Sequence, residues 1–313
     1  MDKYPFHHPQ EDWELILNPM HGQTAIVTGA SGGIGVEAVR LLIKNGYSVI
    51  GLDKDYHPDL GTLPGDQYCH VKVDITDDDS VRQACVQIRQ IGSAEPKAFA
   101  TPSHAILAAG GALPEEVCYE DPLDLHLDTF QKSVTVNLSG QYVCLKHFVP
   151  LLERAEKPTL GSAAIVDRSI TMVSSINSVG DFGYPAYASA KAGLAGLARS
   201  LAGSLGRRGI RINVVAFGTV RTQYAEELHA SDPSHFSRLE KLAALERIST
   251  STEAAQVLLA MTQLSSVTGQ VITADCGQAI PGNRRYSPAT PELYVQDPAV
   301  ISDKEVESAP WSF

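Results

Sequence analysis

The chain has 313 residues, of which 43% are hydrophobic and 19% are charged, a composition ordinary for a soluble globular protein. Its 25 Lys and Arg residues against 36 Asp and Glu residues give a formal net charge of −11. This balance argues against general nucleic-acid binding, because neutralising phosphates requires clustered basic side chains.

The segments that would indicate another compartment are absent from the sequence pattern. No apolar run approaches the roughly 18 residues that a membrane span requires. The first 20 residues lack the basic and then apolar order of a signal peptide. The five cysteines show no C-x-x-C pair, which favours reduced thiols over disulfides or zinc. We therefore expect a cytoplasmic protein with no metal, no nucleic-acid partner and no membrane partner.

Short apolar runs alternate with amphipathic segments along most of the chain. The first strand is expected at residues 24–28, and the helix after its glycines stops near Asn45 and Gly46. Further strands are expected at 47–53, 68–73, 104–108, 169–174, 211–215 and 270–274. Further helices are expected at 77–91, 127–153, 185–206 and 252–264. This order predicts an α/β protein, a doubly wound Rossmann fold with seven parallel strands.

The alternation spans one domain, residues 22–280, between two segments that do not share it. Residues 1–21 are expected to form a polar N-terminal extension. Residues 281–313 are expected to form a C-terminal tail, rich in proline and acidic residues, that ends in Trp311-Ser312-Phe313. That aromatic end is either part of a loosely ordered tail or a segment that docks on a neighbouring subunit or over a substrate cleft.

A glycine-rich turn follows the first strand, with the sequence Thr28-Gly29-Ala30-Ser31-Gly32-Gly33-Ile34-Gly35. Glycines at these positions let the backbone approach a pyrophosphate, and the helix that follows supplies N–H groups and a positive dipole end. No Gly-Lys-Ser/Thr follows, so a P-loop nucleotidase is not supported. The turn predicts a dinucleotide-binding site.

Asp53 ends the second strand, where a carboxylate accepts hydrogen bonds from the adenosine ribose and repels a 2′-phosphate. NAD is therefore the expected cofactor. Lys54 follows directly and weakens this discrimination, so NADP stays possible.

Tyr187 and Lys191 lie four residues apart on a predicted helix, so their side chains share one face. A free phenol has a pKa near 10, too high for a base at neutral pH. A neighbouring ammonium group favours the phenolate and is expected to lower that pKa. Tyr187 can then exchange a proton with a substrate oxygen. The alternative is a plain surface Tyr and Lys.

The glycine spacing of Thr28–Gly35, followed by Tyr187-Ala-Ser-Ala-Lys191, resembles the short-chain dehydrogenase/reductase family in its compact single-domain branch. The resemblance runs from about residue 22 to residue 277. It implies hydride transfer between NAD(P)(H) and a secondary alcohol or ketone of a small molecule. It also implies that Tyr187 acts as the acid/base and that Lys191 lowers its pKa.

The resemblance implies two more catalytic residues. Asn137 matches the family's helix asparagine in a water-linked proton relay from the lysine. A serine after the fifth strand binds the substrate oxygen, and the match from the strand side gives Ser175. Counting back from Tyr187 gives Ser174 instead, and we prefer Ser175.

The remaining matches concern the cofactor. Asp74 and Ile75 match the adenine contact, Ala109 and Gly110 pass the adenosine ribose, and the other positions meet phosphates or nicotinamide. The implied cofactor-binding residues are Gly29, Ser31, Gly33, Ile34, Gly35, Asp53, Asp74, Ile75, Ala109, Gly110, Tyr187, Lys191, Val220 and Thr222.

Two motifs depart from the family pattern. The segment Leu107-Ala108-Ala109-Gly110 lacks the usual asparagine, which puts a hydrogen bond between sheet and loop in doubt. Phe217-Gly218 replaces the usual Pro-Gly, which leaves the shape of the nicotinamide pocket open. Residues 219–246 lie where related enzymes carry a substrate lid.

The glycines and alanines of the predicted helix 185–206 suit close packing, either on its own sheet or, as the resemblance implies, in a homodimer or homotetramer.

Two other functions remain open on this fold. One is a catalytically silent nucleotide-sensing or scaffold protein, which the two departures would favour. The other is a sugar-nucleotide epimerase or dehydratase, which also uses Tyr-x-x-x-Lys. That branch differs in glycine spacing and needs a larger C-terminal domain than residues 281–313 provide.

Overall fold

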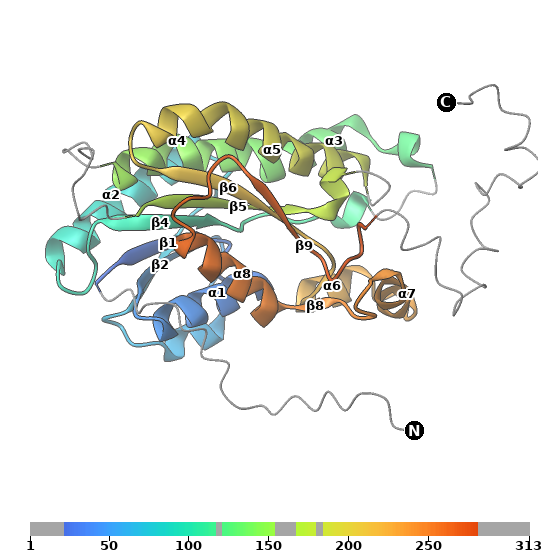
Figure 1. The fold of residues 1–313 in the computed structure, drawn as a ribbon, viewed down its shortest axis with the longest axis horizontal. Coiled ribbons are helices and arrows are strands. Elements are labelled where there is room, and N and C mark those ends of the chain that lie inside the picture. The colour runs from blue at the N-terminus through green and yellow to red at the C-terminus, as the bar shows by residue number, and fades with distance from the viewer. Residues whose placement is uncertain (1–21, 117–120, 154–166, 180–183, 281–313) are drawn as a thin grey trace, which may run out of the picture.

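The computed structural model describes residues 22–116, 121–153, 167–179 and 184–280 (Figure 1). The two predicted flanking segments, 1–21 and 281–313, lie outside the described residues.

One parallel sheet forms the centre of the domain. Its strands are β1 (Thr24–Thr28), β2 (Ser48–Asp53), β3 (Tyr68–Lys72), β4 (Pro102–Leu107), β5 (Ser169–Ser175), β6 (Arg211–Phe217) and β9 (Val271–Ala274). They lie in the order β3-β2-β1-β4-β5-β6-β9, and each neighbouring pair is parallel. The predicted seven-stranded Rossmann fold is confirmed. The strand order reverses between β1 and β4, which opens a crevice at the carboxyl ends of the strands.

Helices cover both faces of the sheet (Figure 1). On one face lie α1 (Gly33–Lys44) and α8 (Ser251–Gln263), and on the other lie α2 (Asp78–Ala94), α4 (Gly140–Leu152) and α5 (Pro185–Gly206). The shorter α3 (Leu127–Val134) precedes α4. Two further helices, α6 (Gln223–Leu228) and α7 (His235–Leu242), lie together at one end of the sheet, where β7 (Val220–Arg221) pairs with β8 (Ser249–Thr250).

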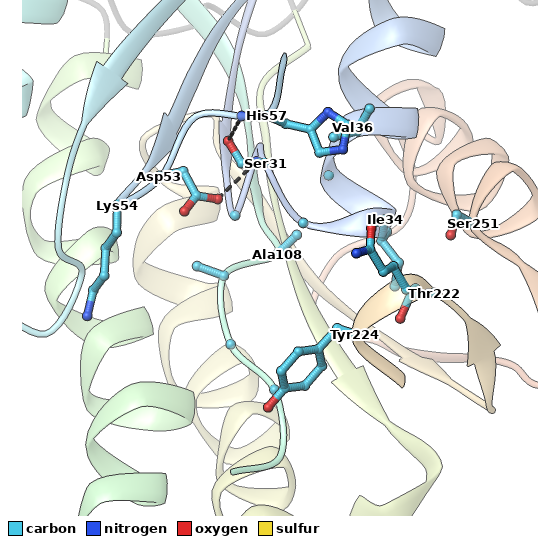
Figure 2. Close-up of a pocket in the computed structure, with 18 of the residues that line it drawn as sticks. Ser31, Ile34, Val36, Asp53, Lys54, His57, Ala108, Thr222, Tyr224 and Ser251 are labelled. Atoms are coloured by element: carbon cyan, nitrogen blue, oxygen red, sulfur yellow. Dashed lines mark hydrogen bonds between the residues drawn. The ribbon is translucent and has the colours of Figure 1, made fainter. Parts of the chain in front are cut away.

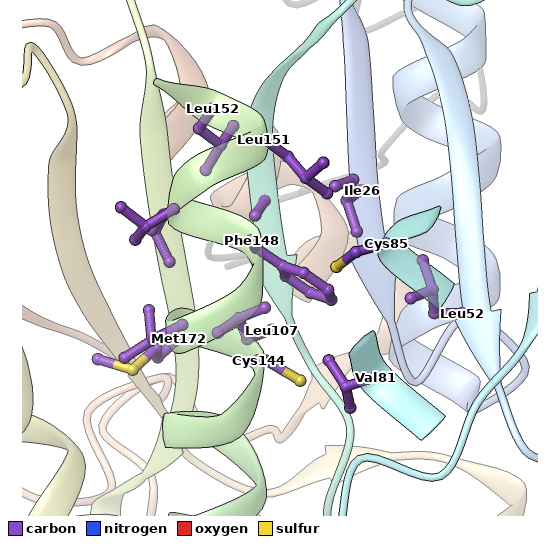
Figure 3. Packing of buried hydrophobic residues seen from close by; sticks show 14 of the residues in the cluster. Ile26, Leu52, Val81, Cys85, Leu107, Cys144, Phe148, Leu151, Leu152 and Met172 are labelled. Carbon is purple, nitrogen blue, oxygen red and sulfur yellow. The ribbon is translucent and has the colours of Figure 1, made fainter. Parts of the chain in front are cut away.

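The strands are apolar on both faces because helices cover both, and every residue of β1, β4 and β6 is buried. Successive side chains of a strand point to opposite faces, so the sheet separates two hydrophobic clusters. Figure 3 shows Phe148 and Cys144 of α4 beside Leu107 and Met172 of the sheet. This packing fixes α4, and with it the helix segment that reaches the crevice.

The predicted single helix over residues 127–153 is interrupted. A π-helical turn, Thr135–Ser139, separates α3 from α4 and contains Asn137. The side-chain amide of Asn137 donates to the carbonyl of Ser133, the acceptor that its own backbone N–H would use in an α-helix. Periodicity does not reveal such a turn, because the apolar pattern continues through it. The turn places Asn137 at the crevice.

Candidate active site

The glycine-rich turn after β1 folds tightly against the loop after β4. Gly29 has a φ of +68°, and a Cβ atom there would lie 2.7 Å from the backbone nitrogen of Ala109. A Cβ on Gly35 would lie 1.9 Å from the carbonyl oxygen of Gly29. Only glycine fits at both positions. Within the described residues no side chain caps α1, so its first-turn N–H groups are available to an anion.

A cavity of about 840 Å³ opens at this turn. It borders β1, β2, β4 and the start of α1, and Figure 2 shows Asp53 and Lys54 at one end and Thr222 and Tyr224 at the other. Among the predicted cofactor residues, its lining includes Gly29, Ser31, Gly33, Ile34, Gly35, Asp53, Ile75, Ala109, Gly110 and Thr222. Asp74, Tyr187, Lys191 and Val220 are predicted cofactor contacts that do not line it. The glycine cradle, the uncapped helix and the cavity fit a dinucleotide.

The Asp53 carboxylate faces the glycine turn. One oxygen accepts the backbone N–H of Ser31 at 2.9 Å (Figure 2), and the other accepts the N–H of Asp55 at 3.3 Å. The Ser31 hydroxyl donates to the carbonyl of Asp55 and accepts from the N–H of His57. These bonds fix the carboxylate at the end of β2 and leave lone pairs free on both oxygens.

Two cationic side chains line the Asp53 end of the cavity, and both are paired with carboxylates. The Lys54 ammonium lies 2.9 Å from Asp74. The Arg40 guanidinium, which the sequence analysis missed, lies 2.8 Å from Glu37 and 2.7 Å from Asp59. No local motif marks Arg40, because its acidic partner Asp59 follows 19 residues later.

Tyr187 and Lys191 lie on one face of the first turns of α5, as predicted. The Lys191 ammonium nitrogen is 5.5 Å from the centroid of the Tyr187 ring, and it donates to the carbonyl of Val173 at 2.9 Å. Only 2% of Lys191 is exposed, and burial lowers its pKa to about 8. A Cβ on Gly110 would lie 3.5 Å from this nitrogen, so the loop after β4 meets the Tyr-Lys pair.

The pKa of Tyr187 differs from the expectation of a lowered value. Burial raises the pKa of Tyr187 to about 12, against a hydrogen bond with Ser175 that lowers it, and the charge of Glu116 raises it further. Desolvation of the phenolate therefore outweighs its stabilising contact. Lys191 is not among the groups that shift the pKa of Tyr187; its nitrogen lies over the ring and donates to the Val173 carbonyl.

The two serines at the end of β5 have different surroundings. The Ser174 hydroxyl is buried and donates to the backbone carbonyl of Lys191 at 3.0 Å. The Ser175 hydroxyl donates to Asn177 at 3.1 Å, and it lowers the pKa of Tyr187. Ser175 is thus the serine beside the phenol, in agreement with the match from the strand side.

The Asn137 side chain is occupied by the loop after β4. Its oxygen accepts the N–H of Gly111 and its nitrogen donates to the carbonyl of Gly111, each at 2.9 Å. Gln141 of α4 donates to the carbonyl of Ala109 at 2.6 Å, and Thr28 accepts the N–H of Ala109 at 3.3 Å. These three side chains hold the loop in which the usual asparagine is missing.

Two other residues at the crevice make contacts that the sequence did not predict. The buried carboxylate of Glu116 accepts the N–H of Tyr187 at 2.9 Å. The Tyr224 hydroxyl of α6 donates to the carbonyl of Ala112 at 2.5 Å, which links the predicted lid to the loop after β4. Neither residue stands in a recognisable motif, because both partners are remote in sequence.

Two other features bear on the class of protein. Within the described residues no helix has the length and apolar character needed to cross a membrane. In the same part of the chain no three His, Cys, Asp or Glu side chains gather as metal ligands. The fold and the glycine cradle define a nucleotide-binding Rossmann protein, and Ser175, Tyr187 and Lys191 lie together beside its crevice.

Comparison with known proteins agrees. A family model described as enoyl-(acyl carrier protein) reductase matches residues 29–279. A 2,5-dichloro-2,5-cyclohexadiene-1,4-diol dehydrogenase of Sphingobium indicum is 28% identical over 83% of this chain and 98% of its own. Cis-4-hydroxycyclohexanecarboxylate dehydrogenase of Sinomonas cyclohexanicum is 30% identical over 82% of this chain and 96% of its own.

A solved short-chain dehydrogenase/reductase structure from Burkholderia thailandensis is 28% identical, with a TM-score of 0.65 over 82% of this chain and 92% of that one. The chain belongs to the short-chain dehydrogenase/reductase family. It is an oxidoreductase that acts on CH–OH groups with NAD(H) or NADP(H).

Proposed function

We propose that this chain interconverts a cyclic secondary alcohol and its ketone with NAD(H), and that Tyr187 moves the proton. The observation that carries the proposal is the contact of Ser175 with the Tyr187 phenol, beside the buried Lys191. The hydroxyl and the phenol both offer hydrogen bonds to one substrate oxygen. The loop that meets this group, Gly110 to Leu113, also lines the cavity.

The cofactor would be held by the chain's own backbone and by Asp53. The glycine turn and the first turn of α1 supply N–H groups for the pyrophosphate, and Asp53 accepts from the adenosine ribose hydroxyls. Ile75 packs on the adenine side, and Thr222 lies at the nicotinamide side. When bound, the nicotinamide supplies the hydride acceptor or donor.

The side chains carry the proton chemistry. During oxidation Ser175 donates a hydrogen bond to the alcohol oxygen, and the Tyr187 phenolate accepts the proton of that hydroxyl group. During reduction the Tyr187 phenol donates the proton to the carbonyl oxygen. The Lys191 ammonium, 5.5 Å from the centroid of the Tyr187 ring, places a positive charge beside the phenolate, and Asn137 remains the predicted member of a water-linked proton relay.

Three charges support NAD over NADP. Asp53 places a carboxylate where the 2′-phosphate of NADP would lie, and like charges repel there. Lys54 and Arg40 would have to leave Asp74 and Asp59 to neutralise that phosphate. Binding of NADP would therefore break two ion pairs that binding of NAD leaves intact.

A cyclic alcohol is proposed from the chemistry named for two relatives, a cyclohexadienediol dehydrogenase and a hydroxycyclohexanecarboxylate dehydrogenase. In this chain, Leu113 and Tyr224 line the far end of the cavity and offer apolar surface to a ring.

We also expect a homodimer or homotetramer, which light scattering after size exclusion would reveal. Gly193 packs against Leu138 of its own chain, whereas Gly196 has open space beside it.

The test is turnover of cis-4-hydroxycyclohexanecarboxylate and of cyclohexanol, with NAD⁺ and NADP⁺ in parallel, followed by nicotinamide absorbance. We expect the rate with NAD⁺ to be the greater. Tyr187→Phe should lower kcat by about 100-fold or more while enhancement of nicotinamide fluorescence still reports cofactor binding. Undiminished turnover by Tyr187→Phe would remove Tyr187 from the mechanism. Cofactor binding without turnover across a wider alcohol panel would favour the silent nucleotide-sensing alternative.

A further inference from the structure

Glu116 is a carboxylate placed inside the protein near the reacting groups. It ends a 3-10 turn, Pro114–Glu116, in the segment after β4, and only 3% of it is exposed. A buried carboxylate is costly unless hydrogen bonds satisfy it. Its hydrogen-bond partners therefore indicate the role of this carboxylate.

Three donors from three parts of the chain converge on this carboxylate. One oxygen accepts the N–H of Leu113 at 2.7 Å and the hydroxyl of Ser133 at 3.0 Å. The other accepts the backbone N–H of Tyr187 at 2.9 Å. All three partners donate, which suits the ionised form, since a carboxylate only accepts. The contact with Tyr187 spans 71 residues of sequence.

The Tyr187 N–H belongs to the first turn of α5, where backbone N–H groups lack partners within the helix. The residue before the helix, Tyr184, provides no side-chain cap. Glu116 therefore performs the capping from a distant loop, and its negative charge complements the positive end of a 22-residue helix. The cap lies on the residue that carries the reacting phenol.

The same carboxylate connects to the other groups of the site. Ser133 also offers its backbone carbonyl to the amide of Asn137 at 3.1 Å, and Asn137 holds Gly111. Leu113 lines the cavity. Glu116 thus connects the loop after β4, the π-helical turn that contains Asn137, and α5.

The charge also acts on the phenol electrostatically, since Glu116 raises the pKa of Tyr187, after the larger effect of burial. Its exposed neighbour Glu115, paired with Lys132 at 3.0 Å, is not among the groups that shift the pKa of Tyr187. The two adjacent glutamates therefore provide a natural comparison between a buried charge and an exposed one.

We propose that Glu116 is a positioning residue for Tyr187, which fixes the start of α5 through the Tyr187 N–H and keeps a negative charge near its phenol. The inference rests on the proposed function, in which Tyr187 exchanges the proton.

The experiment compares Glu116→Gln, Glu116→Ala and the control Glu115→Gln in the full chain. The first readout is kcat/KM against pH for oxidation of cis-4-hydroxycyclohexanecarboxylate with NAD⁺. Oxidation needs the phenolate, which a nearby negative charge disfavours. In Glu116→Gln the limb that rises with pH should therefore move to lower pH by about half a unit or more. Glu115→Gln should leave it in place.

Glu116→Ala leaves three buried donors without their acceptor, and kcat should fall about tenfold or more. Glu116→Gln keeps an oxygen for the Tyr187 N–H and should recover part of that loss. A limb that stays in place in Glu116→Gln, or that moves equally in Glu115→Gln, would overturn the proposal.

A second readout needs no turnover. Backbone amide exchange in ¹⁵N-tyrosine-labelled protein, with the Tyr187 signal assigned from Tyr187→Phe, should be at least about tenfold faster in Glu116→Ala. Unchanged exchange would overturn the proposal. Absence of turnover by the wild-type chain would contradict the proposed function alone, because the exchange rate still decides whether Glu116 holds Tyr187.

Discussion

The hydroxyl of Ser174 donates a hydrogen bond to the backbone carbonyl of Lys191 at 3.0 Å and so ties the end of β5 to α5. The next residue, Ser175, lies at the Tyr187 phenol instead and lowers its pKa. Successive residues of a strand point to opposite faces, so two chemically identical side chains receive different surroundings. One serves the packing of the helix and the other faces the reacting group.

Exchanging each serine for alanine separates these two roles. Ser175→Ala should lower kcat by about 100-fold, because the substrate oxygen loses one of its two hydrogen-bond partners in the transition state. Ser174→Ala should lower the free energy of unfolding by about 1 kcal/mol and leave the pH profile unchanged. Steady-state kinetics and urea unfolding of both variants check this. The reverse pattern would make Ser174 the substrate-binding serine.

Asp53 is expected to select the cofactor through its charge. Asp53→Asn should weaken NADH binding by about tenfold and reduce the preference for NADH over NADPH by a larger factor, since the repulsion of the 2′-phosphate disappears. Fluorescence titration with each cofactor measures both affinities. Asp55→Asn is the matched control, because Asp55 uses its backbone in the contacts with Ser31 and Asp53. An unaltered preference in Asp53→Asn would assign the selection to other groups.

The bond between Tyr224 and Ala112 joins the two sides of the cavity and is expected to slow the exit of the cofactor. Tyr224→Phe removes the donor and keeps the ring. Release of NADH, followed by stopped-flow fluorescence, should become about threefold to tenfold faster, as expected for loss of one hydrogen bond. The exposed Tyr142 of α4 offers the control Tyr142→Phe. Equal rates of NADH release in the wild type, Tyr224→Phe and Tyr142→Phe would show that this hydrogen bond does not slow the exit of the cofactor.

His104 predicts a specific loss of stability in acid. It is fully buried between Ser169 and Gln23, and burial lowers its pKa to about 4 from an ordinary value near 6.5. Between about pH 4 and pH 6.5 the unfolded chain therefore binds a proton at His104 that the folded chain does not bind. The contribution of His104 to the free energy of unfolding is fully present above about pH 6.5. It is lost as the pH falls toward 4, by about 3 kcal/mol in total.

Urea unfolding at several pH values checks this expectation against His104→Gln, which keeps polar partners for Ser169 and Gln23. The variant should be less stable at pH 7.5 and should lose less stability on acidification. An equal pH dependence in both proteins would show that other groups, such as His70, dominate this range.

The sequence by itself predicted the sheet, the glycine turn and the pairing of Tyr187 with Lys191. Each depends on residues that lie close together in the chain: an apolar run for a buried strand, glycines where the backbone turns, and a four-residue spacing on a helix. The interruption of residues 127–153 by a π turn was missed, because the apolar pattern continues through Asn137.

Tertiary structure alone decided how these groups act on one another. It separated Ser174 from Ser175, brought Glu116 to Tyr187 and gave Asn137 the loop at Gly111 to hold. It also reversed the expected direction of the pKa shift of Tyr187, which burial raises. Periodicity records which face of a segment is apolar. Desolvation and hydrogen bonds between distant segments depend on which surfaces meet, and only the folded chain determines that.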